Sequence, residues 1–67
     1  MDYVYLVQED IHGLQGIYAD KDKATAEVKR IGYGMYDLPE NEPLDYDDED
    51  RFGWDGVADW TRVAVIK

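Results

Sequence analysis

Negative charge is concentrated in one short part of this 67-residue chain, residues 37–50. Two such charges about 7 Å apart in water repel each other by roughly 0.6 kcal/mol, while the whole stability of a small domain is only about 5–15 kcal/mol. The segment is therefore excluded from a core, and the net charge of −9 to which it contributes most needs a functional or a solubilising reason. Eight carboxylates fall there without a Lys or Arg between them: Asp37, Glu40, Glu42, Asp45, Asp47, Asp48, Glu49 and Asp50.

The length of the chain limits its core. We expect one domain, residues 1–67, and a chain of this size buries only about 60% of the surface that it exposes when unfolded. Cysteine is absent, which excludes disulfides, thiolate zinc sites and thiol nucleophiles and suits a reducing compartment. Six Tyr, two Trp and one Phe must therefore supply much of the packing.

Three segments are predicted to form strands. Residues 3–7 are apolar on both alternating faces, which is typical of a strand buried on two sides. A turn that ends at Gly13 leads to a second strand over residues 14–19. The chain closes with a third strand over residues 60–66, where apolar residues alternate with period two.

A helix is predicted over residues 21–31. Asp20 precedes it and can accept hydrogen bonds from the free N–H groups of the first turn. Two basic residues occupy the last turn, where they favour the negative end of the helix dipole, and Gly32 is expected to end the helix. Its buried face is formed by Ala24, Val28 and Ile31.

These elements predict an α+β fold of ββαβ type, with a three-stranded antiparallel sheet in the order 2-1-3 and one helix on one face. Residues 32–56 form a connection about five times longer than an ordinary loop, and we expect a long acidic loop there. A helical turn over residues 44–51 is an alternative that like charges oppose. One helix covers only one face of the sheet, so the loop or a partner is needed over the other. The expected covers are Phe52, Trp54 and Trp60.

Specific metal binding and catalysis both lack the residues that they need. A calcium-binding EF-hand loop begun at Asp45 would have Asp50 where glycine is required and Gly56 where glutamate is required. His12 is the only histidine, Cys and Ser are absent, and no catalytic triad can be assembled. We therefore expect no enzyme activity, no cofactor and no specific metal site, and we expect His12 to be a solvated loop residue.

Two interpretations of the acidic segment stay open. In the first, it is a solvated loop whose charge keeps an aromatic-rich protein in solution. In the second, its carboxylates stand where phosphates would and occupy the basic groove of a nucleic-acid-binding protein. An extended segment offers about one charge per 6 Å, and a helical one about one per 2.6 Å, against one per about 1.7 Å of duplex axis.

Aromatic residues beside the acids complete the predicted binding site, because Trp and Tyr are enriched among the residues that dominate interfaces. Trp60 begins a predicted strand and is assigned to the core, whereas Trp54 is open to either role. Neutralising residues 47–50 is expected to abolish binding and to leave the fold intact or more stable. The predicted partner-binding residues are Asp45, Tyr46, Asp47, Asp48, Glu49, Asp50, Trp54 and Asp55.

Two segments carry a resemblance to a known group of proteins. Residues 16–30, GIYADKDKATAEVKR, combine a strand, the capping Asp20 and an alanine-bearing helix, and the chain ends in WTRVAVIK. This layout covers about half of the chain and resembles small bacteriophage inhibitors of ββαβ type. The resemblance implies a protein that binds and disables host machinery, as polymerase inhibitors, anti-CRISPR and anti-restriction proteins and glycosylase inhibitors do, several of them as acidic DNA mimics. The acidic insertion departs from the polymerase inhibitors, so no target is carried over.

The leading prediction is a non-enzymatic, phage-encoded inhibitor that blocks a basic surface of a host nuclease, polymerase or other nucleic-acid-binding protein. Its acidity argues against direct binding to nucleic acid or to anionic membranes. The alternative is a homodimeric protein-interaction module, joined through the uncovered sheet face or the third strand, with acids that serve solubility or weak cation binding. Neither a basic leader nor an apolar stretch of about 18 residues is present, so we expect a soluble protein of the host cytoplasm.

Overall fold

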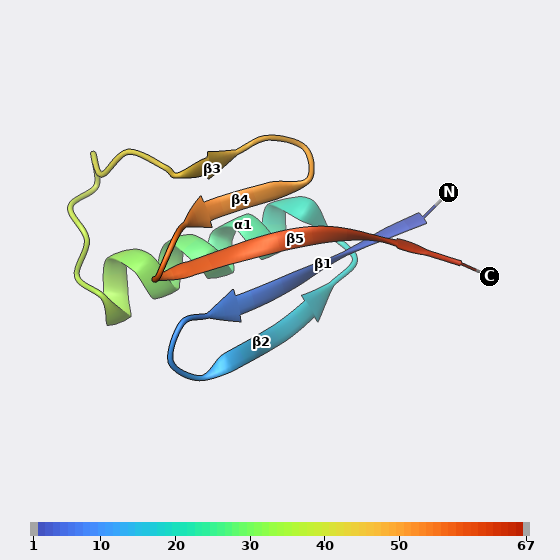
Figure 1. Ribbon diagram of the computed structural model, residues 1–67, viewed down its shortest axis with the longest axis horizontal. Coiled ribbons are helices and arrows are strands. Elements are labelled where there is room, and N and C mark those ends of the chain that lie inside the picture. Colours follow the sequence, from blue (N-terminus) through green and yellow to red (C-terminus); the bar gives the residue numbers. More distant parts are fainter. Residues whose placement is uncertain (1, 67) are drawn as a thin grey trace.

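The computed structural model describes residues 2–66, which form an antiparallel sheet with a helix on one face (Figure 1). The strands lie in the order β2-β1-β5-β4-β3, and each neighbouring pair is antiparallel. The α+β class is therefore as predicted. In chain order the elements are β1 (Asp2–Glu9), β2 (Gly13–Tyr18), α1 (Lys21–Arg30), the π-helical turn η1 (Ile31–Met35), β3 (Tyr46–Asp47), β4 (Arg51–Trp54) and β5 (Ala58–Val65).

The three strands expected from the sequence are β1, β2 and β5, and β1 lies between the other two. The prediction of a three-stranded sheet is nevertheless wrong, because part of the acidic segment folds into the additional hairpin β3–β4. Phe52 and Trp54 alternate along β4 and stand opposite Trp60 and Ala58 of β5. Burial of these aromatic rings favours strand pairing over a loop or the helical turn considered for residues 44–51, and that alternative is also wrong.

α1 begins and ends within one residue of the helix predicted over residues 21–31, but the chain stays helical beyond it. The side chain of Asp20 accepts hydrogen bonds from the backbone N–H groups of Asp22 (2.8 Å) and Lys23 (3.4 Å), a cap worth about 1 kcal/mol. The expectation that Gly32 ends the helix is wrong, because the chain continues through η1, and a residue in the left-handed conformation, Asp37 (φ 55°), follows only after this turn. Gly32 instead provides space, because a Cβ there would lie 2.5 Å from the Trp54 ring.

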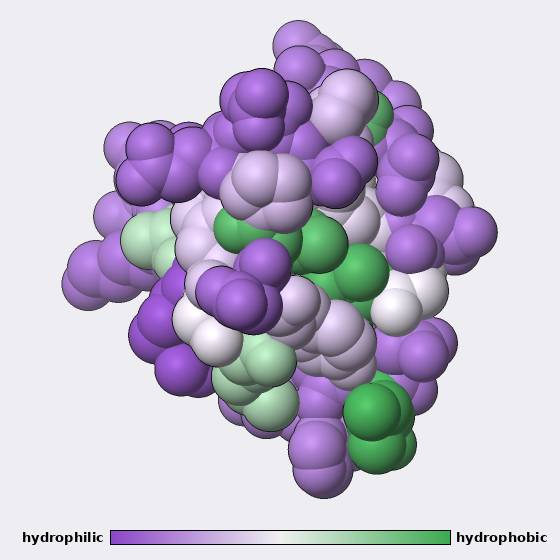
Figure 2. Space-filling view, turned by 90° about the vertical axis from the view of Figure 1, so that its left-hand side faces the viewer, coloured by the Kyte–Doolittle hydropathy of each residue, from purple (hydrophilic) through white to green (hydrophobic). Residues whose placement is uncertain are grey.

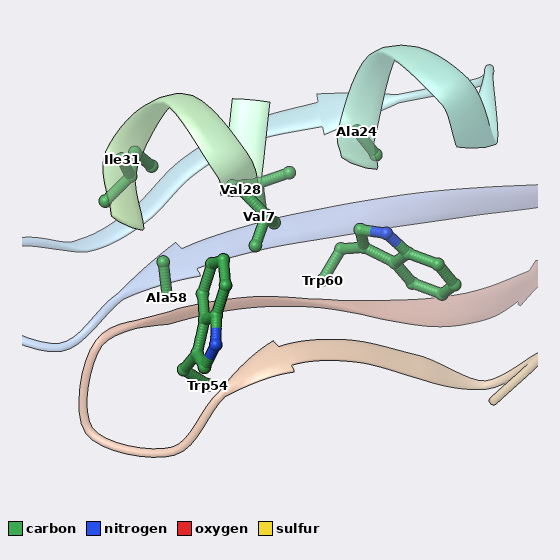
Figure 3. Packing of buried hydrophobic residues seen from close by; sticks show 7 residues of the cluster. All are labelled: Val7, Ala24, Val28, Ile31, Trp54, Ala58 and Trp60. Carbon is green, nitrogen blue, oxygen red and sulfur yellow. The ribbon is translucent and has the colours of Figure 1, made fainter. Parts of the chain in front are cut away.

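Trp60 is the largest fully buried side chain and lies between α1 and the sheet (Figure 3). Its indole N–H donates to the Thr25 hydroxyl of α1 at 2.9 Å, and the Tyr5 ring meets it edge-on at 4.9 Å between centroids. The assignment of Trp60 to the core is therefore confirmed. The buried apolar residues are Val7, Ala24, Val28, Ile31, Trp54, Ala58 and Trp60.

The aromatic residues expected to cover the second face of the sheet do not lie on that face. Trp60 is opposite Val7, Phe52 is opposite Trp60, and Trp54 is opposite Ala58, so all three rings share the face that α1 covers. The prediction is wrong because the register of β5 and β4, which local sequence does not fix, decides which side these rings take. The second face keeps exposed apolar side chains, including Ile17 and Val63.

Candidate functional site

The acidic segment divides into two parts of different structure. Residues 37–44 follow η1 as an irregular connection, whereas Asp45 opens a hairpin by donating its backbone N–H to the Gly53 carbonyl at 3.0 Å. We call residues 45–54 the acidic hairpin. It lies along one edge of the sheet, where β4 pairs with β5 and β3 is outermost (Figure 1). Five of the eight clustered carboxylates therefore belong to the acidic hairpin: Asp47 lies on β3, Asp45 precedes it, and the other three occupy the turn between β3 and β4.

Asp48 builds the turn of the acidic hairpin. Its Oδ1 atom accepts hydrogen bonds from the backbone N–H groups of Asp50 (2.8 Å) and Arg51 (2.9 Å). The backbone N–H of Asp48 donates to the Arg51 carbonyl at 3.0 Å. An aspartate that accepts from the N–H two residues ahead forms a side-chain turn of its own, which explains how three consecutive acids can occupy a tight reversal.

Two arginines fix the acidic hairpin to its neighbours. Arg62 of β5 donates its backbone N–H to the Asp50 carbonyl and its guanidinium to Asp50 Oδ1, both at 2.8 Å. Arg51 donates to Asp59 Oδ2 at 2.5 Å, and this hydrogen bond raises the pKa of Arg51. Because the Asp50 side chain is 78% exposed, its ion pair contributes about 0–1 kcal/mol and serves mainly to set geometry.

Tyr46 is held in place on β3. The Arg51 guanidinium lies 3.8 Å from the centre of its ring, a cation–π contact. Burial is the largest effect on its hydroxyl and raises its pKa, while Arg51 acts in the opposite direction. On the adjacent segment, the backbone N–H of Asp55 donates to Asp45 Oδ2 at 2.8 Å, which ties the two ends of the acidic hairpin together.

Two carboxylates of the acidic hairpin remain available to a partner. Asp47 and Glu49 are exposed, and within residues 2–66 no hydrogen bond or ion pair engages their side chains. The predicted site is thus partly assembled: Asp45, Asp48 and Asp50 hold the hairpin, whereas Asp47 and Glu49 project unpaired charge. Substituting all four residues 47–50 would disturb the turn as well as the charge, so the expectation that such a variant keeps its fold intact does not suit the roles of Asp48 and Asp50.

Trp54, named with the acids as a binding residue, is placed in the core. It is 3% exposed, its ring meets Tyr33 at 5.4 Å between centroids, and its indole N–H points to the Glu42 carbonyl at 3.4 Å. The ring is therefore not available as a surface anchor. Its contribution to the site is indirect, because it holds the end of β4 under η1.

A buried carboxylate that sequence reasoning missed lies at the end of β1. Glu9 is 3% exposed and accepts hydrogen bonds from the Tyr36 hydroxyl (2.6 Å), from His12 Nδ1 and from the backbone N–H of Ile11. The Tyr36 and His12 hydrogen bonds lower the pKa of Glu9 to about 2, and the bond to Glu9 raises the pKa of Tyr36 to about 12. Glu9 thus joins the β1–β2 turn to the end of η1, and His12, although exposed, is not simply solvated.

A shallow depression of about 330 Å³ lies at the same end of the molecule, between the β1–β2 and β4–β5 connections. Figure 2 looks onto this end, where hydrophilic side chains surround a small group of apolar ones. The charged residues that line the depression are Glu9, Asp10, Arg51, Asp55 and Asp59. Among residues 2–66 no three His, Asp or Glu side chains are grouped so as to hold a metal ion. In the same part of the chain, the helices are too short or too polar to cross a membrane.

Comparison of the chain with protein-family models, curated proteins and solved structures finds no match. The arrangement of charge on the fold is therefore the basis for a functional proposal.

Proposed function

We propose that this chain is a non-enzymatic acidic binding protein that docks its acidic hairpin onto a basic, nucleic-acid-binding surface of another protein and blocks it, as small phage inhibitors do. The observation that carries the proposal is that Asp47 and Glu49 present unpaired carboxylates from a hairpin that other contacts already hold in place. A phage origin and action in the host cytoplasm belong to the proposal.

Preorganisation supports the proposal. Binding by a disordered acidic loop would have to overcome the entropy of ordering its backbone, about 1–2 kcal/mol for each residue fixed. Here the turn hydrogen bonds of Asp48 and the pairing of Asp50 with Arg62 fix the backbone before a partner arrives. Charge that is held in a defined position gives specificity and speeds association with a surface of opposite charge.

Charge segregation supports it further. Between Arg30 and Arg51 the chain carries no Lys or Arg, and four of its seven basic residues are on α1. The acidic run, residues 37–50, therefore contains no base of its own, and the one arginine of the acidic hairpin, Arg51, pairs with Asp59 outside the run. A basic partner would meet net negative charge there.

The observed strand geometry narrows what the hairpin can imitate. Even a fully extended chain, at about 3.3 Å per residue, would offer only about one charge per 6 Å over the acidic segment, sparser than the one per about 1.7 Å of duplex axis. The denser helical arrangement does not form, because β3 and β4 pair and residues 48–50 make the turn between them. The proposal is thus a small cluster of carboxylates at the turn of a hairpin that occupies a basic groove, and not a replica of both strands of a duplex.

The first test is capture followed by competition. The immobilised chain is mixed with bacterial lysate at about 0.05 M and about 0.5 M salt, where the screening length falls severalfold, and bound proteins are identified by mass spectrometry. Each captured protein is then tested for loss of binding to a labelled DNA duplex as the chain is added. We expect capture at low salt only, and displacement of the duplex.

Matched variants locate the binding surface. Asp47→Asn with Glu49→Gln removes the two unpaired charges, and Glu40→Gln with Glu42→Gln makes the same change in net charge outside the acidic hairpin. If each exposed ion pair contributes about 0.2–1 kcal/mol, the first double variant binds about 2- to 30-fold more weakly. Equal weakening by both double variants would show that net charge alone matters, and captured proteins that never release DNA would refute the proposal.

A further inference from the structure

The sheet ends in an edge strand that carries no charge. β2 forms the edge opposite β3, and its residues, GLQGIY, include no Asp, Glu, Lys or Arg although the chain has a net charge of −9. Natural edge strands are usually protected from pairing with other chains by charged residues or proline. β2 has neither, so no charged residue or proline on it opposes pairing with another chain.

Apolar exposure on the uncovered sheet face is highest at this same edge. Leu14 and Ile17 stand opposite Gln8 and Leu6 of β1 and are 53% and 61% exposed. Val63 lies on the same face two strands away, on β5, and is 40% exposed. The part of the surface that most lacks a neighbour is therefore centred on β2.

We propose that β2 pairs in antiparallel fashion with β2 of a second copy of this chain, which joins two five-stranded sheets into one. A strand paired with its own copy across a two-fold axis makes each contact twice, the arrangement common to symmetric dimers. Directly paired side chains would then lie about 4.5–5.5 Å apart, so that Leu14 and Ile17 gain apolar neighbours on the uncovered face. This inference is independent of the proposed function.

The distribution of charge explains why a second copy fits here and not at the other edge. β3 and β2 are separated by four strand spacings of about 4.8 Å each, so pairing through β2 leaves the two acidic hairpins about 43 Å apart. That distance is several times the screening length of about 8 Å at physiological salt. Pairing through β3 would instead bring the two acidic hairpins into contact.

The backbone of β2 limits how strong this pairing is. Gln15 has no partner on β1, since Val7 pairs with Gly16 and Gln8 with Leu14, so β2 carries a bulge. A bulge interrupts regular pairing and is one of the devices that blunt edges. The association therefore depends on the side chains of Leu14 and Ile17, and we expect a dissociation constant in the micromolar range.

Sedimentation equilibrium of the full chain up to roughly 0.5 mM tests the proposal. We expect a monomer–dimer equilibrium that added salt strengthens, because salt screens the repulsion between two chains of charge −9. Ile17→Lys should weaken the dimer by about tenfold or more, while Val63→Lys, on the same face but away from the edge, should change it by less than about twofold. Circular dichroism checks that both variants keep their fold.

Each outcome decides the proposal. A wild-type chain that stays monomeric up to roughly 0.5 mM overturns the proposed β2 pairing. Equal weakening of the dimer by Val63→Lys and Ile17→Lys also overturns it, since this would indicate that two sheet faces pack on each other. The Asp47→Asn/Glu49→Gln variant should dimerise like wild type. Failure of this inference is thereby distinguishable from failure of the proposed role of the acidic hairpin.

Discussion

Replacement of Gly32 by alanine measures how closely Trp54 packs against the π-helical turn. A Cβ at this position would lie 2.5 Å from Cζ3, 3.0 Å from Cε3 and 3.1 Å from Cη2 of Trp54, whereas carbon atoms are best separated by about 3.5–4.0 Å. The ring is 3% exposed and has little room to move away. Overpacking of this kind costs about 1–3 kcal/mol.

The helical preference of alanine acts in the opposite direction. Alanine stabilises a helical position by about 0.5–1 kcal/mol relative to glycine, which would partly offset the clash. Gly34 provides the matched control, because it lies in the same turn and a Cβ there would meet nothing within 4 Å. Gly34→Ala should therefore gain the stabilisation of alanine in a helix without any clash. The difference in the free energy of unfolding between the two variants then isolates the cost of overpacking.

Urea unfolding of both variants gives the result. We expect Gly32→Ala to be less stable than Gly34→Ala by about 1–3 kcal/mol, and its melting temperature to be lower by at least about 4 °C. If the two variants agree within about 0.5 kcal/mol, the Trp54 ring does not require glycine at position 32, and the role assigned to Gly32 in the packing is refuted.

Two further predictions concern buried hydrogen bonds. The pKa of Glu9 lies at about 2 instead of 4.5 because Tyr36 and His12 donate hydrogen bonds to it, so the stabilisation by ionised Glu9 is complete above about pH 4.5 and is lost as the pH falls towards 2. When urea midpoints are measured from pH 2 to pH 7, Glu9→Gln should remove this part of the loss of stability at low pH. An unchanged pH dependence would contradict the assignment. Thr25→Val leaves the buried N–H of Trp60 without an acceptor and should lower the free energy of unfolding in urea by about 1–3 kcal/mol. Thr25→Ser keeps an acceptor and should lose less stability. Equal stability of the two variants would show that this hydrogen bond is unimportant.

Much of the acidic hairpin could not be predicted because its stability comes from distant parts of the chain. The charges of residues 45–50 argued against order, and nothing nearby in sequence indicated that Arg62 of β5 would bind Asp50. The alternation of Phe52 and Trp54 around Gly53 indicates a strand, but it does not indicate which face of the sheet the two rings cover. Glu9 was missed for a related reason, since its main partner, Tyr36, is 27 residues away.

The sequence by itself determined the elements that depend on local interactions. The apolar run of β1, the capping Asp20 and the spacing of Ala24, Val28 and Ile31 fix a hairpin, a helix and a closing strand, because each depends on residues within a few positions of one another. Tertiary structure decided that the chain stays helical past Gly32, which face receives the tryptophans, and that part of the acidic segment joins a hairpin. Those outcomes depend on register and on contacts between distant residues, which the periodicity of a single segment does not contain.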